Sequence, residues 1–231
     1  GLLTLVTRVL QTLDQLELTA EALKLSELEI RRLGEVSFLA GDRDWALACY
    51  TAAATIAPGQ PATLRSLSRL ARESGDDENL RQHLDGLLEL DPDDPHLLRE
   101  HARLLTKLGD EGAERDLRRL EAMGIETAED KSMLASLAVR AGDTDVALQS
   151  IEAALASDPN EEDWLRKAEI HLERNERGLG ITAADEAIAL NRQSGPAWAV
   201  RAQLLKNEPG RLEEALKAAT HAVALGESQV R

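Results

Sequence analysis

Residues 134–155 read LASLAVRAGDTDVALQSIEAAL, and this stretch predicts the fold class. Its apolar residues recur at spacings of three and four, as they do on one face of a helix. They include Leu134, Ala138, Ile151 and Leu155. Between the two apolar runs stands Gly142-Asp143, where Gly can take the left-handed conformation that ends a helix. Asp143 can then accept hydrogen bonds from the free amides of the next helix, so the stretch predicts two short helices joined by a tight turn.

The same turn recurs along the chain at an almost constant interval. Gly-Asp begins at positions 41, 75, 109 and 142, at separations of 34, 34 and 33 residues. Prolines keep this period, from Pro58 to Pro92 and from Pro61 to Pro95. A fixed period of this length is the signature of an array of helical repeats, in which each unit buries its apolar face against its neighbours.

Two helix starts are also visible in the sequence. Asp94-Pro95 places a hydrogen-bond acceptor at the cap and Pro in the first turn, and Ser26 with Glu29 fits a capping box. These signals predict that helices begin directly after Ser26 and after Asp94.

The repeating unit resembles the tetratricopeptide repeat, a family whose unit is a helix-turn-helix of about 34 residues. The best match is in residues 27–60, where Leu33-Gly34, Ala46, Tyr50, Ala53 and Pro58 stand at the family's signature positions. The resemblance implies an all-α, right-handed superhelical α-solenoid of about six repeats. The expected units are residues 27–60, 61–94, 95–127, 128–160, 161–194 and 195–226, followed by a tail at 227–231.

The third unit departs most from the pattern. Residues 95–127 replace the closing Pro, and their second helix is one residue out of step with the other units. Because the stability of such an array is a sum of units and of nearest-neighbour interfaces, we expect the weakest junction here.

Residues 1–26 do not match the unit, but their apolar residues follow the spacing of a coiled-coil seam. These are Val6, Val9, Leu13, Leu16, Ala20 and Leu23. The segment is predicted to be an extra N-terminal helix. It either caps the array, as the remaining half of a truncated repeat, or forms a homodimer.

Composition excludes several classes of protein. The 231 residues carry 27 Lys and Arg against 42 Asp and Glu, a net charge of −15, whereas a nucleic-acid-binding face needs an excess of cations. No apolar run is long enough to insert into a membrane, so we expect a soluble chain, cytoplasmic or periplasmic. An aromatic content of 2% predicts a core of Leu, Ala, Ile and Val, and 21 Arg against 6 Lys favours a GC-rich bacterial genome.

No constellation of catalytic residues is visible, and we expect neither an enzyme nor a cofactor or metal. The five His residues are dispersed, and His171 and His221 fall at positions that predict packing. The single Cys49 cannot form an internal disulfide and lies in a helix expected to be packed. Trp164 and Trp198 occupy a packing position of the family that the repeats resemble.

The resemblance implies that the first helices of the repeats line a concave groove. In the first three units the groove positions hold seven cations and two anions. The cations are Arg31, Arg65, Arg69, Arg72, Arg99, Arg103 and Lys107. Further along, Val139, Leu165 and Leu172 offer apolar contact.

Two interpretations of these cations remain open. They bind an acidic peptide or a free C-terminal carboxylate of another protein through bidentate Arg contacts, or they pair with acidic residues of neighbouring helices. Family members that hold chaperone tails use Lys and Asn at set places, and Arg65 and Arg69 stand here without the Asn. The sequence therefore predicts a non-enzymatic peptide-binding scaffold. The alternative is a self-associating segment of a larger bacterial secretion, assembly or motility complex.

Overall fold

The computed structural model describes residues 25–206 and 208–229, and within these ranges the chain forms helices and no strand. The chain divides into two compact units, residues 1–113 and residues 114–231. The seam predicted between Val6 and Leu23 lies outside the described residues, and so does the choice between a capping helix and a dimerisation helix.

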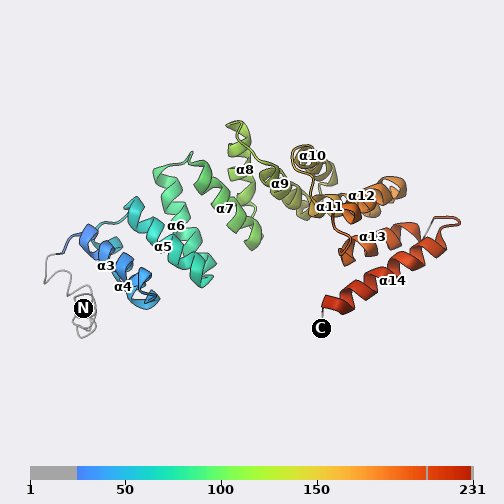
Figure 1. Cartoon of the computed structure of the whole chain (residues 1–231). Helices are drawn as coiled ribbons and strands as arrows, with labels where there is room; N and C mark the ends of the chain where they lie inside the picture. Colours follow the sequence, from blue (N-terminus) through green and yellow to red (C-terminus); the bar gives the residue numbers. More distant parts are fainter. Residues whose placement is uncertain (1–24, 207, 230–231) are drawn as a thin grey trace. The chain divides into compact units, whose positions relative to one another are not determined.

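The first unit is built from consecutive helical hairpins (Figure 1). Its helices are α3 (Glu27–Leu39), α4 (Arg43–Ile56), α5 (Pro61–Ser74), α6 (Asp77–Leu90) and α7 (Pro95–Leu108). Helices α3 and α4 pack as one pair and α5 and α6 as the next, while α4 also contacts α5. Helix α5 therefore lies between its own partner and the preceding hairpin.

The second unit repeats the same arrangement. Helix α8 (Gly112–Ala122) spans the division, and the unit continues with α9 (Ala128–Ala141), α10 (Thr144–Leu155), α11 (Glu161–Glu173), α12 (Arg177–Leu190), α13 (Gly195–Leu205) and α14 (Leu212–Gln229). Helix α14 extends past residue 226, where the sixth repeat was expected to end. The prediction of an all-α solenoid made of paired helices is confirmed.

The turns between paired helices have the predicted chemistry. Gly75 and Gly142 take left-handed conformations, with φ of 72° and 77°, directly after α5 and α9. The carboxylates of Asp76 and Asp143 then accept hydrogen bonds from backbone amides in the first turns of α6 and α10. The recurrent Gly-Asp pair thus ends one helix and begins the next.

Both predicted helix starts are also present. The Ser26 side chain accepts a hydrogen bond from the Glu29 amide and the Glu29 carboxylate accepts one from the Ser26 amide, which completes the capping box. Asp94 caps α7, which has Pro95 in its first turn. A further capping box, formed by Thr127 and Asp130 at the start of α9, was not singled out in the sequence.

The third expected repeat contains a short second helix. Helix α8 has 11 residues, and Gly124 takes a φ of 69° shortly after its end. The division between the two units falls between Ala113 and Glu114, inside residues 95–127.

Small residues allow the paired helices to approach closely. Ala46, Ala53 and Tyr50 of α4 are fully buried, and a Cβ placed on Gly34 of α3 would lie 2.6 Å from Cε1 of Tyr50. The tyrosine ring therefore occupies the space that any larger residue at position 34 would need.

Trp164 and His171 are packed as expected, whereas His221 is not. Trp164 packs against two buried clusters of the second unit, and His171 is buried with Nδ1 2.7 Å from Glu176. The packing prediction for His221 is wrong, because the residue is exposed, although its ring makes a T-shaped contact with the Trp198 ring. No further first helix follows α14 within the described residues to cover that side.

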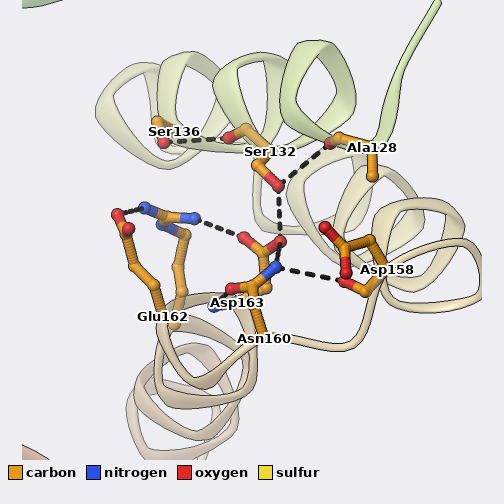
Figure 2. A network of polar contacts seen from close by, with 8 residues as sticks. Ala128, Ser132, Ser136, Asp158, Asn160, Glu162 and Asp163 are labelled. Atoms are coloured by element: carbon orange, nitrogen blue, oxygen red, sulfur yellow. Dashed lines mark hydrogen bonds and ion pairs between the residues drawn. The ribbon is translucent and has the colours of Figure 1, made fainter.

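A buried carboxylate joins two first helices of the second unit (Figure 2). Asp163, at the start of α11, is buried and accepts hydrogen bonds from Asn160 Nδ2 at 2.9 Å and from Arg166 Nη1 at 2.7 Å. It also accepts one from the Ser132 hydroxyl of α9. This buried carboxylate accepts three hydrogen bonds, and we interpret it as structural.

Replacement of Gly34 by Ala should lower the free energy of unfolding by about 1–3 kcal/mol, because the new Cβ overlaps the buried Tyr50 ring. The matched control is Gly178→Ala, where no atom lies within 4 Å. That change should raise stability by up to about 1 kcal/mol, because Ala favours the helix. Chemical denaturation measures both values, and equal effects would contradict the proposed close approach.

Asp163→Ala should lower the free energy of unfolding by about 1–3 kcal/mol, because it removes three hydrogen bonds at a buried carboxylate, although Arg166 keeps Glu162 and Ser132 keeps the Ala128 carbonyl as acceptors. Asp158→Ala is the control, since that residue contributes only its backbone carbonyl to the network. The control should change stability by less than about 0.5 kcal/mol in the same urea titration.

Candidate functional site

The first helices of the first unit line a pocket of about 550 Å³. Side chains from α3, α5 and α7 form its walls, with two leucines of α6 behind them. The lining residues are Arg31, Glu35, Ala62, Arg65, Ser66, Ser68, Arg69, Arg72, Leu84, Leu87, Asp94, His96, Leu97 and Glu100. We call this the first-helix pocket. It brings together four of the cations that the sequence predicted for the groove.

Helix α5 supplies more lining residues than any other helix because several of its residues share one side of the helix. Ala62, Arg65, Arg69 and Arg72 are separated by three or four residues and therefore share one side of the helix. Pro61 in the first turn and left-handed Gly75 at the end fix the helix bounds and so place these side chains.

Arg69 is held by several groups at once. Its Nη2 lies 2.7 Å from Glu35 Oε2 and 3.2 Å from the Tyr50 hydroxyl, and its guanidinium stacks 3.8 Å from the centroid of the Phe38 ring. Ser66 also donates to Glu35 at 2.8 Å. Arg69 is therefore fixed between α3 and α4.

Three other predicted cations form ion pairs as well. Arg31 Nε lies 3.1 Å from Glu27, on the same helix. Arg72 Nε donates to Glu100 of α7 at 2.9 Å. Lys107 of α7 contacts Asp77 of α6 at 2.6 Å, outside the pocket lining. The interpretation that cations pair with neighbouring acids therefore holds for these residues and for Arg69.

Arg65 differs from its neighbours on α5. Its side chain is exposed at the pocket, and it makes no hydrogen bond or ion pair with any residue that the structure describes. Arg99 and Arg103 lie on α7 and are not part of the pocket lining, although each has interactions of its own. Arg65 is thus the groove cation whose guanidinium is available to a ligand.

The pocket is less cationic than the groove positions predicted. Four arginines line it together with the carboxylates of Glu35, Asp94 and Glu100. Asp94 and Glu100 were missed because they stand outside the groove positions that the resemblance supplied. Glu100 pairs with Arg72, 28 residues earlier, and no spacing along one helix indicates such a contact.

The predicted apolar groove residues belong to the second unit, where each is partly buried. Val139 packs against the cluster that contains Ile151. Leu165 and Leu172 pack against the cluster that contains Leu204. Part of each side chain therefore contributes to the core of that unit.

Burial and hydrogen bonds shift three pKa values near the pocket. Burial raises the pKa of Glu35, but the hydrogen bonds from Arg69, Ser66 and Tyr50 outweigh it and hold that pKa below its usual value. Burial, followed by the charge of Glu35, raises the pKa of Tyr50 to about 12. Burial also raises the pKa of Cys49 to about 11, so this thiol is packed and unactivated, as predicted.

Metal and membrane sites were also sought in the part of the chain that the structure describes. There, no group of three or more His, Cys, Asp or Glu residues is arranged to hold a metal ion. No described helix combines the length and apolar character needed to cross a membrane.

Solved structures share this architecture. MamA is 16% identical with a TM-score of 0.65, over 74% of this chain and 93% of that chain. PilF of Pseudomonas aeruginosa is 15% identical with a TM-score of 0.60, over 85% and 88%. A tetratricopeptide repeat protein from Parabacteroides merdae is 17% identical with a TM-score of 0.54, over 87% and 78%.

No protein-family model matches this chain, and no curated protein matches it. At the identities of the solved structures, the likeness concerns the fold alone. It confirms the predicted resemblance at that level, and the chain has the tetratricopeptide repeat fold.

Tyr50 gives a direct test of the pocket electrostatics, because it is the one tyrosine of the chain. Its phenol should titrate at about pH 12, well above the usual value near 10, in ultraviolet absorbance of the folded protein. Glu35→Gln should lower this midpoint, because it removes the adjacent negative charge. Asp77→Asn, a change on α6 beside Lys107, should leave it unchanged.

Proposed function

We propose that this chain is a non-enzymatic protein-protein interaction scaffold, and that its first-helix pocket binds an acidic segment of another protein. The observation that carries the proposal is Arg65, an exposed guanidinium at a pocket whose other arginines are already paired. A free guanidinium presents a planar set of donors that matches a carboxylate in bidentate geometry.

The existing ion pairs limit what the pocket accepts. Arg31, Arg69 and Arg72 are occupied by Glu27, Glu35 and Glu100. A polyacidic ligand would compete with these carboxylates, whereas one carboxylate beside Arg65 would not. The pocket therefore favours a segment with one acidic group over a long acidic tract.

Apolar contacts complete the pocket. Ala62, Leu87 and Leu97 line it beside the charged groups. Burial of an apolar ligand side chain against them contributes to affinity in proportion to the area removed from water. We therefore expect the ligand to place an apolar residue next to its carboxylate.

The charge of the whole chain opposes long-range attraction of anions. The net charge is −15, so an acidic segment gains from the pocket only at short range, within about the 8 Å Debye length of physiological salt. The contribution of Arg65 should accordingly shrink as the ionic strength rises.

The test compares peptides that carry one Glu between two Leu residues, with a free or an amidated C-terminus, by calorimetry and by the Nε–H resonance of Arg65. Arg65→Glu should weaken binding about 10- to 100-fold, the equivalent of about 1.5–3 kcal/mol for a charged hydrogen bond. The peptide with Gln in place of Glu should bind as weakly to the unmodified protein.

The matched control is Arg32→Glu, the same charge reversal at an exposed arginine of α3 that does not line the pocket. It should alter binding less than about twofold, the effect of a distant screened charge. Equal losses in the two variants would show a general charge effect and would remove the pocket as the binding site. Preference for the free C-terminus would identify a terminal carboxylate as the ligand.

A further inference from the structure

A second hollow of about 500 Å³ lies in the first unit, over the second helices α4 and α6. Helix α5 contributes its other side to it. The lining residues are Arg43, Asp44, Leu47, Thr51, Ala54, Leu67, Leu70, Ala71, Ser74, Asp76, Asn79 and His83. We call this the second-helix pocket.

The two pockets share no lining residue. Arg65, Arg69 and Arg72 face the first-helix pocket, whereas Leu67, Leu70 and Ala71 line the second. At about 100° of rotation per residue, these two sets lie on opposite sides of α5. A ligand in one pocket therefore does not occupy the other.

The inside of the second-helix pocket is apolar, and one apolar residue of its lining is exposed. Leu67, Leu70 and Ala71 are buried, but Leu47 of α4 is 50% exposed. Leu148 stands at the matching place of α10, one residue after the signature Ala, and it packs against the core cluster of its unit. Leu47 thus presents an exposed apolar surface that a ligand can contact.

The only cation of this lining, Arg43, is already occupied. Its Nη2 lies 2.8 Å from Glu73, and its guanidinium lies 3.8 Å from the centroid of the Phe38 ring. His83 adds no positive charge at neutral pH, because burial lowers its pKa despite the opposing effect of Asp76. An incoming anion therefore finds no available cationic partner among the lining residues.

Two carboxylates remain at the pocket. Asp76 accepts hydrogen bonds from Asn79 N at 3.2 Å and Asn79 Nδ2 at 2.6 Å, which lower its pKa and keep it charged. Asp44 is exposed and makes no hydrogen bond or ion pair with any residue inside the described ranges. An incoming cation therefore meets a carboxylate that forms no ion pair with the described residues.

We propose that the second-helix pocket binds a segment of a partner protein in which an aromatic or branched apolar side chain is followed by a Lys or Arg. The apolar side chain lies against Leu47, Leu67 and Leu70, and the cation pairs with Asp44. This site is independent of the first-helix pocket and selects the opposite charge.

The test uses three probes, N-acetyl-Phe-Lys-amide, N-acetyl-Phe-Glu-amide and N-acetyl-Gly-Lys-amide, titrated against methyl-labelled protein at neutral pH. The Phe-Lys probe should shift the methyl resonances of Leu47, Leu67 and Leu70. It should bind about three- to fivefold more tightly than the Phe-Glu probe, the range for an exposed ion pair. The Gly-Lys probe should leave the methyl resonances unchanged.

Two matched pairs of variants assign the contacts. Asp44→Asn should remove the preference for Phe-Lys, while Glu78→Gln, an exposed carboxylate of α6 outside the lining, should retain it. Leu47→Ala should weaken both Phe probes, while Leu90→Ala, at a similarly exposed leucine of α6 outside the lining, should not.

Equal binding of the Phe-Lys and Phe-Glu probes would overturn the charge assignment. Absence of shifts at the three leucines, or equal effects of a variant and its control, would overturn the pocket itself. Arg65→Glu should leave the Phe-Lys titration unchanged, so this result is separable from the outcome for the first-helix pocket.

Discussion

The structure depends on the close approach of paired helices at positions occupied by Gly or Ala. A Cβ on Gly34 would lie 2.6 Å from the Tyr50 ring, and one on Gly180 of α12 would lie 3.3 Å from Cβ of His171 on α11. Ala46 and Ala147 are fully buried at matching places of α4 and α10. Because the helices of a pair contact at such short range, each hairpin occupies little width, and successive first helices come near enough to form ion pairs.

This proximity determines the electrostatics of the first-helix pocket. Glu35 of α3 reaches Arg69 of α5, and Arg72 of α5 reaches Glu100 of α7, so cations and anions of consecutive repeats neutralise one another. Each pair is partly exposed and contributes little to stability by itself. The pairs nevertheless leave Arg65 as an unoccupied cation. The pocket therefore has one available positive charge, although the net charge of the chain is −15.

Helix α5 connects the two pockets because it has two chemically different sides. Arg65, Arg69 and Arg72 present donors on one side, and Leu67 and Leu70 present apolar surface on the other. The two proposed ligands consequently differ in charge: the first-helix pocket takes an acidic segment, and the second-helix pocket takes a segment with a Lys or Arg.

The sequence by itself determined the Gly-Asp turns, the capping box at Ser26 and the helical segments, because these follow from contacts within about four residues along the chain. It also determined the repeat period, because the same residue types recur at a constant interval. It also identified Arg31, Arg65, Arg69 and Arg72 as residues of one surface. Only the tertiary structure decided which of these are neutralised, that His221 is exposed and that Leu47 is uncovered. These properties depend on side chains roughly thirty residues apart, such as Glu35 and Arg69, whose geometry is set by helix packing rather than by spacing along the chain.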